Sequence, residues 1–229
     1  MFQEQVYVSQ KSNFLVKVYG WMCVALAVTA ITAWYVAATP VISMRIAEQP
    51  LWLLPIILVQ LALVVVLSAM IDKMSYTTAA ILFIIYAISL GITMSLILQM
   101  YTLASVGSTF IVASCMFGGM ALYGYMTQSD LTRMQNILIM IVWGMVVAML
   151  VNLYFKSMQF DYVISMIGVV VFALLTAADT QKLKQLGERF LADEQTRAKA
   201  SLLGALTLYL DFINLFLFLL RFTGTRREQ

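Results

Sequence analysis

Seven long apolar stretches constrain this chain more than any other feature. Each has about the 20 residues that a helix rising about 1.5 Å per residue needs to cross a bilayer. They are 18–39, 51–71, 76–98, 103–126, 137–155, 162–178 and 202–220. Hydrophobic residues make up 62% of the 229 and charged residues 11%, against roughly 45–50% and about 25% in soluble globular chains. We therefore predict an all-α integral membrane protein whose partner is the lipid bilayer.

The predicted organisation is one membrane domain between two short tails. An N-terminal tail, 1–17, precedes a seven-helix bundle over 18–220, and a basic tail, 221–229, follows it. With the N-terminus in the cytoplasm, nine Lys and Arg residues lie in inner segments and two in outer loops, as the positive-inside rule requires. The three arginines of the last tail fit that rule only if the last segment is re-entrant, so full span and re-entrant hairpin both stay open, with the full span preferred.

The composition excludes several classes of function. Net charge is +3 and the cationic residues are scattered, which excludes a nucleic-acid-binding surface. The chain has no histidine, and this removes Ser-His-Asp, Cys-His and HExxH chemistry. Its two cysteines, Cys23 and Cys115, both lie in apolar stretches and indicate packing rather than a metal or disulfide site. We expect no enzymatic activity and no tightly bound cofactor.

Asp211 carries the clearest functional signal, because it lies at the middle of the last apolar stretch. A carboxylate there costs on the order of 2.5–3.5 kcal/mol on insertion scales and is usually retained for function. Helical spacing places Thr207, Asp211 and Asn214 on one stripe, with Arg221 further along the same face. This polar face predicts the lining of a cavity or pathway. The alternative is a hydrogen-bonded clamp between helices.

The other aspartates lie at the ends of the stretches. Asp179 closes the sixth stretch with Lys182 three residues later, and Asp130 follows the fourth with Arg133 at the same spacing. Both patterns are typical of interfacial ion pairs. From the expected helix starts, Asp179 and Asp211 would differ in depth by roughly 10 Å. Pairing them requires the sixth helix to continue towards Lys184, which spacing alone leaves open.

Three motifs closely resemble those of the Bax inhibitor-1 family, also called the transmembrane Bax inhibitor motif or lifeguard-like family. They are the run 205–216 followed by Leu219-Leu220-Arg221, the run 120–125 leading to Asp130-Leu131, and the run 176–182 before a basic loop. The first is long and specific. The resemblance covers the chain from the first apolar stretch onwards and is greatest to the bacterial inner-membrane members.

The resemblance implies a seven-helix bundle with the last helix at its centre, and a calcium leak governed by pH. In that family the residues matching Asp179 and Asp211 form a hydrogen-bonded pair that acts as pH sensor and gate. The same two carboxylates would bind calcium transiently, with Ca²⁺ the permeant ion and protons the regulator. Some members latch the pair with an arginine after the second span. This chain has Lys73 near that point, so any latch either falls to Lys73 or is missing.

Two other functions compete with the leak. Some family members resemble non-conducting regulators that bind other membrane proteins, as modulators of a membrane protease or as suppressors of stress or cell death. Two intramembrane aspartates are also found in intramembrane aspartyl proteases. The Gly-x-Gly-Asp run of those enzymes is absent here, because Leu208-Tyr209-Leu210 precedes Asp211.

Overall fold

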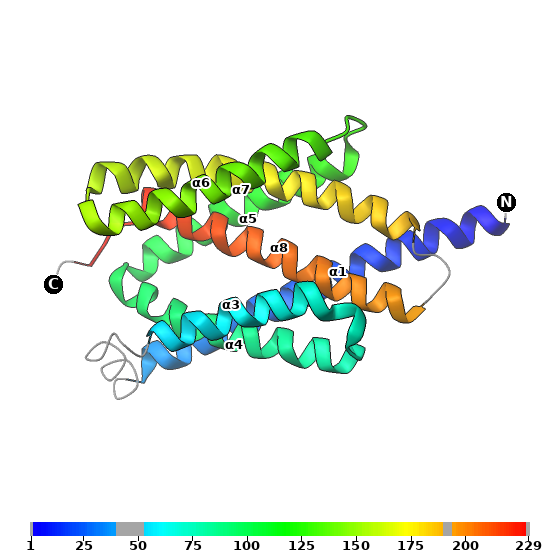
Figure 1. The fold of residues 1–229 in the computed structure, drawn as a ribbon, viewed down its shortest axis with the longest axis horizontal. Coiled ribbons are helices and arrows are strands. Elements are labelled where there is room, and N and C mark those ends of the chain that lie inside the picture. The colour runs from blue at the N-terminus through cyan, green and yellow to red at the C-terminus, as the bar shows by residue number, and fades with distance from the viewer. Residues whose placement is uncertain (1, 40–52, 190–193, 228–229) are drawn as a thin grey trace. The chain divides into compact units, whose positions relative to one another are not determined.

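The structure, a computed structural model, describes residues 2–39, 53–189 and 194–227, and the elements that it contains in those ranges are helices joined by short connections (Figure 1). Its helices are α1 (Phe2–Ala38), α3 (Leu53–Met70), the short 3₁₀ turn η2 (Ile71–Lys73), α4 (Tyr76–Met100), α5 (Leu103–Met126), α6 (Thr132–Phe155), α7 (Met158–Arg189) and α8 (Glu194–Thr223). In the described ranges, seven helices are long and apolar enough to cross a membrane. The predicted fold class, an all-α protein of seven spans, is confirmed.

Several helix ends differ from the apolar stretches. Helix α1 already begins at Phe2, because no proline or glycine interrupts the chain before Gly20. Helix α7 continues to Arg189, well beyond the predicted end at 178. Helix α8 is unbroken from Glu194 to Thr223, so the last segment contains no hairpin. The outer loop with Arg45 and the predicted helix start at 51 lie outside the described residues.

The described residues divide into two compact units. Unit 1 comprises the described residues 2–39, 53–101, 187–189, 194–209 and 227, and unit 2 comprises 102–186 and 210–226. Helix α8 contributes its first half to unit 1 and its second half to unit 2. Among the seven spans, α8 has the largest buried share, 72% of its most apolar window. Such burial is what the predicted central position of the last helix requires.

Unit 1 packs around a close approach of α1 and α4. A Cβ added to Gly91 would lie 2.8 Å from the Thr29 carbonyl oxygen, so only glycine allows the two backbones to come this near. Beside it, Thr29 Oγ1 donates to the Ala87 carbonyl oxygen at 3.0 Å and accepts from the Tyr209 hydroxyl at 2.6 Å. The Tyr209 ring makes an edge contact with Phe83. One buried polar contact thus joins α1, α4 and α8.

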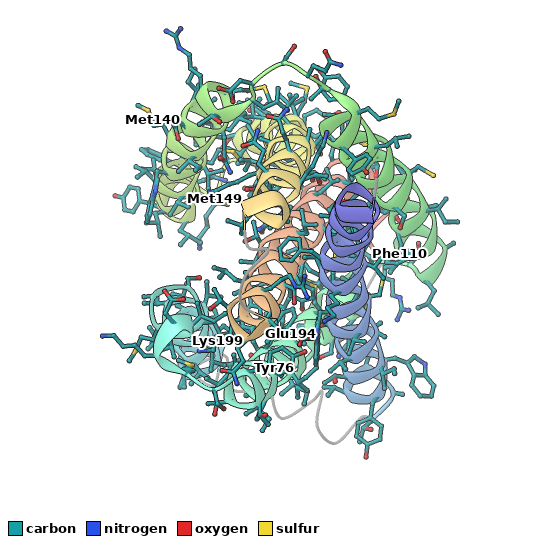
Figure 2. The ribbon with its side chains drawn as sticks, turned by 90° about the vertical axis from the view of Figure 1, so that its right-hand side faces the viewer. Tyr76, Phe110, Met140, Met149, Glu194 and Lys199 are labelled. Carbon is teal, nitrogen blue, oxygen red and sulfur yellow. The ribbon has the colours of Figure 1, made fainter. Side chains whose placement is uncertain are left out.

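The start of α8 is also held within unit 1. Lys199 Nζ donates to the Asp72 carbonyl oxygen in η2 at 3.2 Å; Lys199 is labelled in Figure 2. Asp72 and Lys73 are themselves exposed in this turn.

Unit 2 contains a second set of close helix contacts. A Cβ at Gly124 of α5 would overlap the Ala177 carbonyl of α7, so these two helices also touch through their backbones. Many large apolar side chains of unit 2 are exposed. Met140 of α6, labelled in Figure 2, and Trp143 of the same helix are examples. Apolar surface of this extent is unfavourable in water and suits a hydrocarbon solvent.

Candidate functional site: a buried carboxyl pair

Asp179 of α7 and Asp211 of α8 form a carboxyl pair inside unit 2. Their exposed fractions are 8% and 5%, and the carboxyl group of each acts on the ionisation of the other, as a hydrogen-bonding partner and as a charge. Two carboxylate anions have acceptors only, so a hydrogen bond between them requires one proton. The structure therefore brings together the two residues that spacing alone could not pair. It does so because α7 continues past Asp179 rather than ending there.

The two carboxyl groups have unequal surroundings. Gln135, buried in the first turns of α6, donates from Nε2 to Asp179 Oδ1 at 2.5 Å. Lys182, three residues along α7, adds a positive charge that acts on Asp179. Asp211 Oδ2, in contrast, is buried without a hydrogen-bond partner among the described residues. An anion is best placed where it has a donor and a cation, so in the one-proton state Asp179 carries the charge and Asp211 the proton.

The segment of α7 that follows Asp179 holds the turn between α5 and α6. Gln181 Oε1 accepts from the Leu131 amide at 2.9 Å, and Gln181 Nε2 donates to the Ser129 carbonyl oxygen at 2.8 Å. One turn later Lys184 Nζ donates to the Tyr125 carbonyl oxygen at 2.7 Å and lies over the Tyr125 ring. These contacts supply buried polar groups with partners. They also explain why α7 stays helical beyond the apolar stretch that ends at 178.

The rest of the predicted polar face does not extend the pair as a hydrogen-bonded chain. Thr207 Oγ1 donates to the Leu203 carbonyl oxygen at 3.1 Å, and Asn214 Nδ2 donates to the Leu210 carbonyl oxygen at 2.9 Å. Each of these half-buried side chains thus bonds to its own helix, four residues earlier. Arg221 is exposed in the last turn of α8.

The residues predicted to form interfacial contacts have other surroundings. Asp130 is exposed, and its Oδ1 accepts from the Thr132 amide at 2.9 Å, which satisfies a free donor at the start of α6. Hydrogen bonds from Thr132 lower the pKa of Asp130 below its ordinary value. The contacts of Asp130 in the described part of the chain do not include an ion pair with Arg133. Lys73 is exposed in η2, and its role as a latch stays a prediction.

Sequence reasoning missed Gln135 and Gln181 as members of the site. Gln135 precedes the apolar stretch 137–155 and lies in the segment 132–136, whose residues other than Met134 are polar, as in a loop. Gln181 belongs to the run 176–182 that carries the family resemblance, but its neighbour Lys182 marks that segment as interfacial. No pattern in the chain separates these two glutamines from exposed ones. Only the contact of α7 with the start of α6 reveals them.

Fold and site together define a class: helical membrane proteins of several spans that carry a buried pair of acidic side chains between two of their helices. Residues 11–228 match the family described as "Inhibitor of apoptosis-promoting Bax1". The chain therefore belongs to the Bax inhibitor-1 family, as its motifs predicted.

Bacterial relatives match over nearly their whole lengths. The chain is 49% identical to "Inner membrane protein YbhL" of Escherichia coli strain K12, over 94% of this chain and 92% of that protein. It is 39% identical to a protein of Borreliella burgdorferi, over 99% of this chain and 98% of the relative. A protein of Deinococcus radiodurans is 42% identical, over 97% and 95% of the two chains.

Proposed function

We propose that this protein is a calcium leak channel of the bacterial inner membrane whose gate is the Asp179–Asp211 pair. The single observation that carries the proposal is the placement of two buried carboxyl groups next to each other on neighbouring helices. Carboxyl groups buried in apolar helices are costly, and by default they indicate a functional site such as an ion or proton pathway. The proposal assigns no catalytic reaction and no resident cofactor.

The direction of the pH response follows from the hydrogen bond. While one proton is shared, the pair holds α7 and α8 together and carries one negative charge. When pH rises and that proton leaves, two anions face each other at hydrogen-bonding distance in a site of low dielectric and repel. Separation of the helices, or entry of a cation, relieves the repulsion. The leak should therefore increase as pH rises through the titration of the pair.

Calcium suits such a site as a passing ion. Ca²⁺ prefers carboxylate, carbonyl and water oxygens, and a tight site uses about six to eight of them. Asp179 and Asp211 supply four carboxylate oxygens, and one of these is engaged by Gln135. The remaining ligands would be water or backbone oxygens, so calcium would bind weakly enough to leave.

Location and orientation in the membrane are part of the proposal. The Escherichia coli relative is named an inner membrane protein, and the seven apolar helices support the same location here. The excess of Lys and Arg in the segments that would be inner supports a cytoplasmic N-terminus.

The test is calcium flux into proteoliposomes that contain only this protein, measured across a pH series. Wild-type protein should leak more calcium as pH rises. Asp211→Asn should stay closed at every pH, because an asparagine amide donates to Asp179 whatever the pH, and Asp179→Asn should lose pH dependence likewise. The matched control is Asp130→Asn, which removes an exposed carboxylate of the same unit and should leave the pH profile of the leak unchanged.

Folded protein that passes no calcium at any pH would refute the channel. The acid pair would then be an interhelical clamp, and the regulator that binds other membrane proteins would become the leading function. Flux that keeps its pH dependence in both asparagine variants would leave a leak but remove the pair from its gate.

A further inference from the structure

A stacked pair of phenylalanines repeats the register of the acid pair on the same two helices. Phe172 lies seven residues before Asp179 on α7, and Phe218 lies seven residues after Asp211 on α8. Their ring centroids are 5.6 Å apart, with an angle of 23° between the ring planes. Seven residues return a helix to within about 20° of its starting direction and advance it by about 10 Å. The acid pair and the ring pair therefore lie at two levels of one antiparallel α7–α8 interface in unit 2.

The ring level of this interface is apolar and tightly filled. Phe172 and Phe218 are both buried, as are Leu175 and Leu215, which lie between the two levels on α7 and α8. Gly168 provides the seat for the Phe218 ring, since a Cβ there would lie 2.5 Å from Phe218 Cγ. The Phe218 ring thus contacts α7 at two points, the Phe172 ring and the bare backbone of Gly168. The ring level has no side-chain oxygen that could replace the ligands of a hydrated cation, and the two polar side chains between the levels, Thr176 and Asn214, each donate to a carbonyl oxygen of their own helix.

We propose that the stacked rings of Phe172 and Phe218, seated on Gly168, are the hydrophobic seal of the leak pathway, about two helical turns from the acid pair on the side of the C-terminal end of α8. The inference rests on the proposed function and deepens it, because it separates the switch from the barrier. The acid pair responds to protons, and the ring pair excludes water and ions while it is stacked, as apolar constrictions do in other channels.

Mechanical coupling between the two levels follows from the helices themselves. Helix α8 is unbroken between Asp211 and Phe218, and α7 is unbroken between Phe172 and Asp179. Repulsion that moves Asp211 away from Asp179 therefore moves the rings apart as well, because a hydrogen-bonded helix does not bend sharply without a proline, a bulge or a similar defect. Charging the acid pair would unstack the seal.

The first test replaces each ring and measures calcium flux at the pH where the wild-type channel is closed. Phe218→Ala and Phe172→Ala should leak at that pH as much as the wild-type protein does at its opening pH, with loss of pH dependence, although both aspartates remain. The matched control is Phe110→Ala. Phe110, labelled in Figure 2, contacts Phe212 and Phe216 on the α5 side of α8, so its removal should leave the closed state tight.

A second measurement does not depend on calcium flux. Leu215 is fully buried between the acid pair and the rings, so Leu215→Cys reports whether water reaches this layer. The background carries Cys23→Ser and Cys115→Ser, because both native cysteines are exposed. A charged, membrane-impermeant thiol reagent, added on both sides of the vesicles at the closing pH, should leave Leu215→Cys unmodified in mass spectrometry. Adding Phe218→Ala should make it react.

The two readouts separate the seal from the leak. Reaction of the cysteine only after Phe218→Ala, without calcium flux in any variant, would support the seal and refute the calcium channel. A folded Phe218→Ala protein whose cysteine stays protected and whose flux stays at the closed level would overturn the seal, even if the wild-type protein leaks calcium.

Discussion

The buried contact between Thr29 and Tyr209 yields a sharp prediction about stability. Thr29 Oγ1 has one proton and donates it to the Ala87 carbonyl oxygen, so the Tyr209 hydroxyl must be the donor in the 2.6 Å contact between the two side chains. Tyr209 is fully buried and lies two residues before Asp211 on α8. The perturbations are Thr29→Val, Tyr209→Phe and the two combined.

The magnitudes follow from what each change leaves behind. Tyr209→Phe removes one hydrogen bond and leaves Thr29 bonded to Ala87, which should lower the free energy of unfolding by about 0.5–1.5 kcal/mol, nearer to about 0.6 if the average for membrane helices holds. Thr29→Val leaves the tyrosine hydroxyl buried without an acceptor and should cost about 1–3 kcal/mol. In the double variant phenylalanine removes that unpaired hydroxyl. The double variant should therefore be more stable than Thr29→Val alone.

The assay is reversible unfolding in mixed micelles of a mild detergent and dodecyl sulfate, followed by circular dichroism, with the free energy of unfolding extrapolated to zero denaturant. The four proteins form a double-mutant cycle. Additive costs, with the double variant less stable than either single variant, would refute the reasoning, because they would mean that the tyrosine hydroxyl never lost its partner.

Two further predictions concern unit 2. Gly124→Ala places a Cβ against the Ala177 carbonyl, where backbone rather than a flexible side chain must move. It should lower the free energy of unfolding by about 1–3 kcal/mol in the same assay. The control is Gly118→Ala, where nothing lies within 4 Å of the added Cβ, and this change should be neutral or stabilising. Hydrogen bonds from Thr132 lower the pKa of Asp130 in the folded state. The Asp130 carboxylate therefore stabilises the fold at pH values above its unfolded-state pKa, and this stabilisation is lost as the pH falls through its folded-state pKa. Asp130→Asn should thus reduce thermal stability at neutral pH and make no difference in strong acid, and an equal reduction at both pH values would contradict the assignment.

Much of the fold follows from local properties of the chain. Hydropathy summed over about 20 residues identifies every helix that could cross a membrane, and the structure has these seven in its described residues. Hydropathy did not predict the end of α7 or the ends of α8, because it measures apolar content alone. Helix α7 continues after the apolar stretch has ended, and there Lys184 donates to the Tyr125 carbonyl oxygen, which lies 59 positions away in the sequence.

The candidate site likewise has one residue that the sequence identifies and others that only the structure reveals. Asp211 can be identified from the sequence alone, because the free-energy cost of placing its carboxylate in the membrane depends only on its depth in an apolar helix. Its pairing with Asp179, the donor from Gln135 and the matching stack of Phe172 on Phe218 are relations between helices. Such relations depend on how far one helix is shifted and rotated against another, and many shifts bury nearly the same apolar area. Backbone contact at glycines and the few available polar partners select one of them, so only the tertiary structure decides which groups meet.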